Sequence, residues 1–131
     1  DDAIRTVTAL KIRSVSMRVH RPLQDIYRMA AVVDTLVLHR DALNQQVADP
    51  VQLVLSIFAQ GCTHLELKFG GVTGAHLNEL VEYAPTLSKP AYLYSRLEQG
   101  DADGFLKIGE WNAQVYHETD NDSFELWHDS V

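Results

Sequence analysis

The apolar pattern of residues 35–97 constrains the fold of this chain more than any other feature. Three short apolar runs have the spacing of β-strands, at residues 35–39, 65–69 and 92–94. Between them, apolar residues recur every three or four positions, as on one face of a helix, at residues 51–58 and 77–84. These are two strand–helix–strand units that share their middle strand, and such units form parallel pairs because the helix carries the chain back to its starting edge. The pattern therefore predicts a parallel α/β layer.

The segments that precede this layer predict one more strand and one more helix. Residues 4–19 are rich in β-branched side chains and alternate between polar and apolar, which favours a strand. The alternation changes phase midway, so we expect a bulge or bend near Arg13 and Ser14. Pro22 suits the first turn of a helix, and an apolar stripe follows it over residues 23–33.

Two later helices have recognisable starts. Asp49 followed by Pro50 is typical of an N-cap and the first helical position. Thr73 is the expected cap of the next helix, after the turn Gly70-Gly71.

The C-terminal third predicts strands joined by turns. We expect three strands, at residues 91–98, 105–118 and 123–128, with a bend of the middle one at Gly109. The fold class is thus α/β (or α+β): a mixed sheet with two consecutive βαβ-like units, a C-terminal antiparallel meander, and helices on one or both faces. We expect residues 1–131 to form a single domain.

Composition narrows the class of protein. No apolar run approaches the roughly 20 residues that span a bilayer, and the start of the chain lacks a signal-peptide pattern. We therefore expect a cytoplasmic protein with no membrane partner, although a first residue other than Met is compatible with a missing leader or preceding domain. Cys62 is the only cysteine, which excludes an intrachain disulfide and a cysteine-rich zinc site; a small buried residue is the simplest interpretation.

Charge is distributed unevenly along the chain. Residues 1–28 hold six Lys or Arg against three Asp, a net of +3, whereas residues 98–131 hold nine acids against Lys107, a net of −8. The acidic region argues against a nucleic-acid partner, because phosphates would be repelled. It suits a basic protein partner or head-to-tail self-association, with simple solvation of loops and strand faces as the alternative.

Two motifs indicate a possible ligand pocket at the carboxyl ends of the predicted parallel strands, where α/β proteins often bind ligands. A glycine-rich turn before a helix can hold an anion, although its spacing matches no standard phosphate-binding motif and glycines also serve purely steric needs. A His-Arg-Asp triplet ends the first strand of the layer and could act in acid–base chemistry, or could simply be a polar strand end. The pocket residues would be His39, Arg40, Asp41, Lys68, Gly70, Gly71 and Thr73.

Metal and cofactor sites find little support. Residues 99–110 match part of the calcium-loop pattern, but Gln99 replaces the first Asp and the flanks are predicted strands, so an acidic hairpin turn is the better interpretation. The six histidines form none of the usual ligand spacings. We expect no cofactor and no metal.

The leading functional hypothesis is a small soluble domain that binds another protein in a regulatory, adaptor or inhibitor-like role. No catalytic constellation stands out, so we favour a binding protein over an enzyme. Aromatic and acidic residues concentrate together in the C-terminal sheet, and aromatic residues are enriched at interface hot spots. The expected contact residues are Asp101, Asp103, Glu110, Trp111, Tyr116, Glu125 and Trp127. A homodimer is possible, and the alternative function is a small-molecule enzyme or sensor that binds an anionic ligand at the strand ends.

Overall fold

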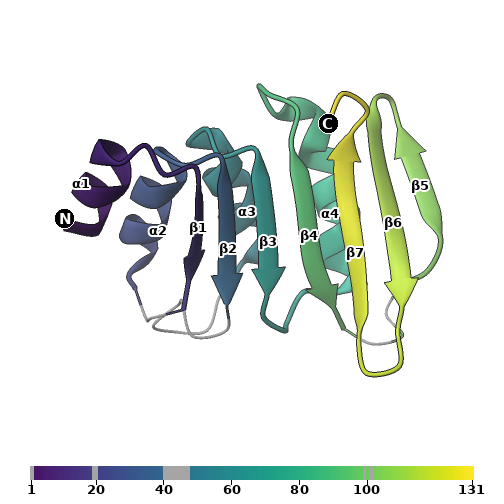
Figure 1. Ribbon diagram of the computed structural model, residues 1–131. Coiled ribbons are helices and arrows are strands. Elements are labelled where there is room, and N and C mark those ends of the chain that lie inside the picture. The colour runs from purple at the N-terminus through teal and green to yellow at the C-terminus, as the bar shows by residue number, and fades with distance from the viewer. Residues whose placement is uncertain (1, 19–20, 40–47, 99, 101) are drawn as a thin grey trace.

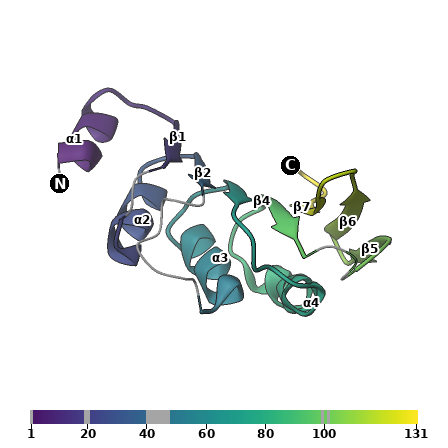
Figure 2. The ribbon, with the colours of Figure 1, turned by 90° about the horizontal axis from the view of Figure 1, so that it is seen from below.

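A computed structural model describes residues 2–18, 21–39, 48–98, 100 and 102–131, and shows one mixed seven-stranded sheet with helices packed on one face (Figures 1 and 2). The helices are α1 (Asp2–Ala9), α2 (Leu23–Ala30), α3 (Pro50–Ala59) and α4 (Gly74–Tyr83), with a 3₁₀ turn η2 (Ala84–Thr86) after α4. The strands are β1 (Ser14–Met17), β2 (Thr35–His39), β3 (His64–Lys68), β4 (Tyr92–Leu97), β5 (Phe105–Ile108), β6 (Trp111–His117) and β7 (Asp122–His128). The predicted mixed sheet, with parallel units followed by an antiparallel meander, is confirmed.

The parallel half repeats one strand–helix unit. Strands β1 to β4 lie side by side in chain order, and α2, α3 and α4 connect them on the same face (Figure 2). Leu36, Leu65 and Leu93 occupy the same register position in successive strands, 29 and 28 residues apart, and each is fully buried. This stacking of similar units onto their neighbours is how repeat proteins are built. Because the order of these four strands does not reverse, they lack the crevice at which doubly wound sheets bind ligands.

The antiparallel half is a meander that returns to the parallel strands. Its strands follow the order β7–β6–β5, and β7 pairs with β4. The predicted single strand over residues 105–118 is wrong: the chain reverses at Gly109 and Glu110, so this stretch forms the hairpin β5–β6. Gly109 has a φ of 60°, a left-handed conformation that favours glycine in a tight turn.

The N-terminal prediction also needs correction. Residues 2–9 form helix α1 and, of the described residues up to 18, Ser14–Met17 form a strand, so the change of phase near Arg13 marks a helix-to-strand transition and not a bulge. The apolar residues Ala3, Ile4 and Val7 are spaced for one helical face, and they pack against the core. A high density of β-branched residues is only a weak signal for a strand, and the packing of this segment against the core outweighs it.

Both predicted caps are confirmed. The Asp49 side chain accepts a hydrogen bond from the backbone N–H of Gln52 at 3.1 Å, with Pro50 in the first turn of α3. Thr73 forms a reciprocal capping box with His76 at the start of α4.

The core lies between the sheet and helices α2, α3 and α4. Its fully buried side chains come from both layers and include Ile26, Ala30, Leu36, Leu38, Ile57, Leu65, Leu93 and Phe124. None of the helices in the described part of the chain has the length and apolar character required to cross a bilayer.

Candidate functional site

The face of the sheet opposite α2, α3 and α4 carries no helix in the described part of the chain (Figure 2), and we call it the open face. Successive side chains of a strand point to opposite faces of the sheet. The buried leucines of β2, β3 and β4 therefore identify the helix-covered face, and the residues that alternate with them lie on the open face. With the strand register, this assigns to the open face Thr35, Val37, His39, His64, Glu66, Lys68, Tyr92, Tyr94, Arg96, Phe105, Lys107, Asn112, Gln114, Tyr116, Ser123, Glu125 and Trp127.

Glu125 is the centre of a hydrogen-bonded cluster on this face. Its carboxylate accepts a hydrogen bond from the Tyr92 hydroxyl and another, at 2.5 Å, from the Tyr116 hydroxyl. Burial, followed by the bond to Glu125, raises the pKa of Tyr92, and the bond to Glu125 is the main cause of the raised pKa of Tyr116. Both phenols therefore stay protonated and act as donors to Glu125.

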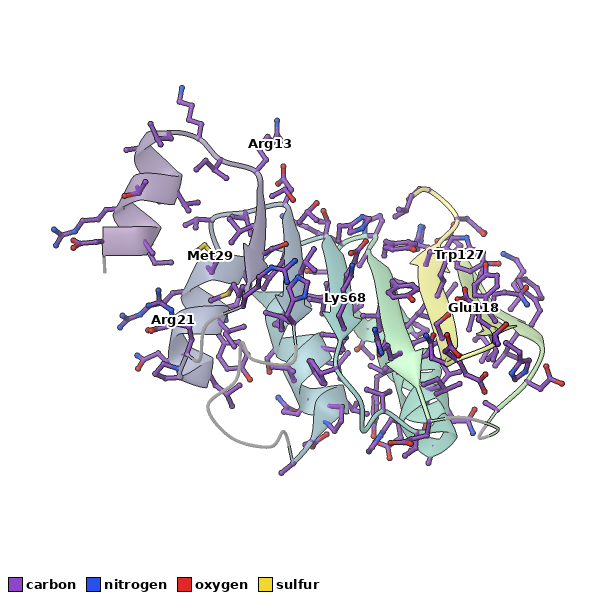
Figure 3. All side chains as sticks on the ribbon, turned by 60° about the horizontal axis from the view of Figure 1, so that its bottom comes forward. Arg13, Arg21, Met29, Lys68, Glu118 and Trp127 are labelled. Atoms are coloured by element: carbon purple, nitrogen blue, oxygen red, sulfur yellow. The ribbon has the colours of Figure 1, made fainter. Side chains whose placement is uncertain are left out.

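Aromatic rings extend this cluster across the sheet. His64 stacks on Tyr92 with 4.5 Å between ring centroids, and its Nε2 lies 3.6 Å from a carboxylate oxygen of Glu66. Phe105 and Trp127 lie 6.4 Å apart, centroid to centroid, toward the other edge. Figure 3 labels Trp127 and Lys68 on their strands. The rings and carboxylates together make a half-buried surface that is aromatic and negatively charged at its centre.

A row of basic residues borders the open face at the carboxyl ends of the parallel strands. His39 and Lys68 are register partners on β2 and β3, and Arg96 lies near the same end of β4. Lys68 and Arg96 are exposed. The open face therefore changes sign along the strand direction, from acidic at the centre to basic at this end.

The structure brings only some of the predicted contact residues together. Tyr116, Glu125 and Trp127 share the open face. Trp111 lies on the opposite face, 6% exposed, with the ring of His128 edge-on at 5.2 Å. Glu110 lies in the β5–β6 turn with a carboxylate oxygen 3.1 Å from His128 Nε2. Asp103 lies in a different part of the structure, and Asp101 lies outside the described residues.

Asp103 belongs to a separate cluster at the far end of the β6–β7 hairpin. His117 lies between two carboxylates, with its Nε2 3.1 Å from Asp103 and its Nδ1 3.1 Å from Asp122. Asp122 also accepts the backbone N–H of Gly100 at 2.8 Å, so the cluster ties the β4–β5 connection to the hairpin. Hydrogen bonds to the carboxylates raise the pKa of His117, and the Gly100 N–H is the largest cause of the lowered pKa of Asp122. Within the described residues, no group of three or more His, Cys, Asp or Glu side chains could hold a metal ion.

Sequence reasoning left several residues of the open face out of the predicted site. They are His64, Glu66, Tyr92, Tyr94 and Phe105. The signal was present for β3 and β4, where these residues alternate with Leu65, Leu67 and Leu93. What the sequence did not provide was the pairing of β4 with β7, which places Tyr92 and Tyr94 next to Trp127 and Glu125.

The predicted ligand pocket is only partly assembled. His39 and Lys68 are adjacent, while Arg40 and Asp41 lie outside the described residues. Gly71 has a φ of 99°, so the turn into α4 uses glycine for its conformation. The Thr73 hydroxyl accepts a hydrogen bond from the His76 backbone N–H, and the Thr73 backbone N–H donates to His76 Nδ1 at 3.0 Å. The start of α4 thus satisfies donors internally that an anion would otherwise use.

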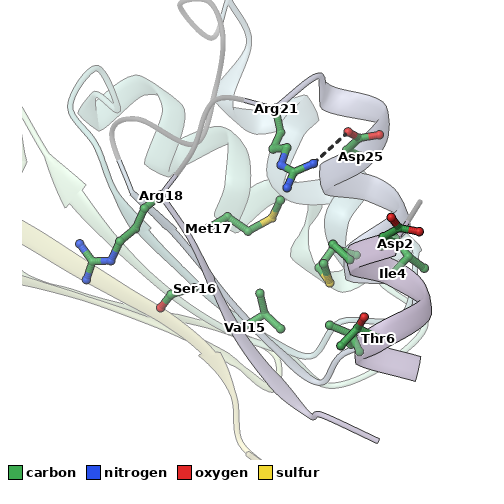
Figure 4. A pocket seen from close by; sticks show the side chains of 12 residues that line it. Asp2, Ile4, Thr6, Val15, Ser16, Met17, Arg18, Arg21 and Asp25 are labelled. Atoms are coloured by element: carbon green, nitrogen blue, oxygen red, sulfur yellow. Dashed lines mark ion pairs between the residues drawn. The ribbon is translucent and has the colours of Figure 1, made fainter. Parts of the chain in front are cut away.

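A cavity of about 430 Å³ lies between α1, β1 and α2; it is mainly apolar, with the Arg21–Asp25 ion pair (3.9 Å) at its rim (Figure 4). Cys62 is buried, and burial is the main cause of its raised pKa, so the thiol is poorly suited to nucleophilic chemistry.

Comparisons of this chain with protein-family models, with curated proteins and with solved structures find no match.

Proposed function

We propose that the protein binds another protein, in a regulatory, adaptor or inhibitor-like role, through the open face. The observation that carries the proposal is the Glu125 cluster, a carboxylate surrounded by aromatic rings on a sheet face that α2, α3 and α4 leave uncovered. Large aromatic side chains supply contact area at little entropic cost, and they dominate interface hot spots. A contiguous aromatic surface of this kind is typical of an interaction site.

The chemistry of the open face favours a partner with exposed Arg or Lys side chains. Within the described part of the chain, neither Glu66 nor Glu125 forms an ion pair with a Lys or Arg. A cationic side chain over this centre would gain a carboxylate and the faces of Tyr92, Tyr94 or Trp127 at once. The net charge of −7 would also speed its approach.

The charge of the chain and its single cysteine, Cys62, support our proposals for the class of partner and the cellular location. The acidic balance disfavours a nucleic-acid partner, because phosphate groups would be repelled. A lone thiol such as Cys62 stays reduced in the cytoplasm, which is the location we propose.

Affinity capture with point variants tests the surface. Trp127→Ala should lower capture of the partner by roughly 30-fold, the effect of losing a hot spot worth about 2 kcal/mol. Glu125→Gln keeps an acceptor but removes the charge, and it should weaken capture most at low salt. Tyr83→Ala removes an exposed aromatic on α4, away from the open face, and should capture as the unmodified protein does. Equal capture by all three folded variants would exclude the open face as the contact surface.

Trp111→Ala is unsuitable for this test. Because Trp111 is buried, its truncation should cost about 3–5 kcal/mol of folding stability, so lost capture would not report on the surface. Melting curves of Trp127→Ala and Tyr83→Ala should stay close to that of the unmodified protein.

The second candidate is a small-molecule enzyme or sensor that binds an anionic ligand at the carboxyl ends of the parallel strands. It is favoured by one observation, the basic row that His39, Lys68 and Arg96 form there. Inorganic phosphate should then raise the melting temperature, since it binds only the folded state, and Lys68→Ala should abolish the rise. Lys89→Ala, at an exposed position before β4, is the matched control. A melting temperature that phosphate leaves unchanged would exclude this candidate.

A further inference from the structure

Strand β5 forms an edge of the sheet with unusual exposure of apolar side chains. All four of its residues are exposed, including Phe105 at 55%, Leu106 at 45% and Ile108 at 42%. In the described part of the chain, β5 pairs only with β6 (Figure 1). Exposed apolar edges promote pairing with another chain, so proteins usually keep them short, as β5 is with four residues, or protect them with charges, proline or a covering element.

The backbone of β5 presents hydrogen-bonding groups to the outside. In an antiparallel pair, residues alternate between bonding their partner strand and pointing away from it. The carbonyl of Gly104 accepts the N–H of Val115 at 3.0 Å, which makes this a hydrogen-bonded pair. By alternation, Leu106 and Ile108 bond β6, whereas the N–H and C=O groups of Phe105 and Lys107 point to the free edge.

The side chains beside this edge leave room for the side chains of an added strand. On the helix-covered face, Ile108 and Trp111 line a hollow of about 410 Å³ together with Pro85 and Leu87. Lys89, Glu110 and His128 also line this hollow. On the open face, Phe105 continues toward Trp127. A strand added beside β5 would therefore place alternate side chains in the hollow and against Phe105.

The charge of residues 98–131 decides which kind of strand can pair with β5. The only cation of residues 98–131 is Lys107, whose Nζ donates to Asp129 at 2.8 Å and to the Asn112 side-chain oxygen at 3.1 Å. This ion pair neutralises the one charge that would protect the edge. A second copy of the chain would bring its own net −8 against the same region, which is repulsive, whereas a basic strand would be attracted.

We propose that β5 accepts an extended segment of a partner protein as an eighth strand, and that this segment alternates apolar with basic residues. Main-chain hydrogen bonds from Phe105 and Lys107 supply the register, and the hollow beside Ile108 takes an apolar side chain. The acids that select Lys or Arg are Asp103 and Glu110, which flank β5 in the chain, and Asp129 beside Lys107. The inference rests on the proposed function only in taking the partner to be a basic protein segment.

Amide hydrogen exchange of the full chain tests the proposal directly, with a synthetic peptide of alternating valine and lysine as the probe. The peptide should slow exchange of the Phe105 and Lys107 N–H groups at least about tenfold and leave Leu106, already bonded to β6, nearly unchanged. A matched peptide of alternating valine and glutamate should have no effect.

Two variants at one position separate backbone pairing from charge attraction. Lys107→Pro removes the outward N–H, and Lys107→Ala removes the same ion pair but keeps the N–H. Lys107→Pro should weaken peptide binding about tenfold relative to Lys107→Ala. Equal melting temperatures of the two variants confirm that the edge tolerates proline.

Three results of the exchange and Lys107 experiments would overturn the edge proposal, and a fourth comes from the comparison with Trp127→Ala. The three are unchanged exchange of Phe105 and Lys107 at saturating peptide, equal peptide binding by both variants, and protection that grows with protein concentration in the absence of peptide, which would assign the edge to a second copy. Binding that is lost in Trp127→Ala but kept in Lys107→Pro would also overturn it, while leaving the open-face function intact. Loss in Lys107→Pro with retention in Trp127→Ala would support the edge and count against the open face.

Discussion

His117 shows how one side chain can make stability depend on pH. Its pKa is raised by Asp122 and Asp103, so its contribution to stability is complete below its ordinary pKa of 6.5 and is lost as the pH rises through the higher folded value. The pKa of Asp122 is lowered, so its contribution is present above 3.8 and is lost as the pH falls through the lower folded value. Together they stabilise the fold most between these two ordinary values.

Replacement of His117 by Gln should remove the alkaline side of this dependence. Relative to His117→Gln, the unmodified protein should lose stability as the pH rises above 6.5, because Gln carries no proton to release. Urea unfolding at several pH values measures the difference, and subtracting the two curves cancels the other five histidines. Parallel curves over this range would contradict the assignment.

Residues also differ in how visible their roles are in the sequence. Trp111 and Trp127 looked equivalent as aromatic residues of an acidic segment. Trp111 is buried on the helix-covered face and Trp127 is half-buried on the open face. The β6–β7 register pairs Trp111 with His128 and Trp127 with Asn112, and neighbouring register positions face opposite sides of the sheet. A prediction that treats residues 105–118 as one strand through Gly109 could not have assigned the two tryptophans to the correct faces of the sheet.

At the scale of single elements, helix α4 depends on its cap. Thr73→Ala should destabilise the protein by about 1 kcal/mol, because the His76 backbone N–H loses its acceptor. Thr73→Ser keeps the oxygen and should cost much less. Thermal or urea unfolding gives both values, and equal losses for the two substitutions would show that the methyl group matters instead of the hydroxyl.

Elements with strong local signals were predicted well, and elements without them were not. Caps and apolar stripes identified α3 and α4, since these signals act within a few residues. Helix α1 was mistaken for a strand because its β-branched residues favour a strand locally, whereas packing of Val7 and its neighbours against the core stabilises the helix. The β5–β6 turn was underestimated because Gly109 permits both a bend and a full reversal.

At the scale of the molecule, the continuous sheet predicts cooperative unfolding. Strand β4 pairs with β3 on one side and with β7 on the other, so the parallel and antiparallel halves share core residues such as Leu93 and Leu126. Far-ultraviolet circular dichroism follows the helices, which in the described part of the chain all precede β4, while tryptophan fluorescence follows β6 and β7. The two melting curves should coincide, as expected for a single domain. Separate transitions would show that the halves are independent folding units.

The sequence by itself determined helices α2, α3 and α4, the parallel strands and the mixed sheet, because hydrophobic period, caps and turn residues act over short stretches of chain. It also determined the charge asymmetry between the N-terminal and C-terminal regions. Only the tertiary structure decided that all three crossover helices share one face, that β7 pairs with β4, and that β5 is left at an edge. These outcomes depend on contacts between residues far apart in the chain, such as Tyr92 with Glu125, and no local pattern encodes them. The aromatic and acidic residues were visible from the start; their assembly on the open face required the sheet.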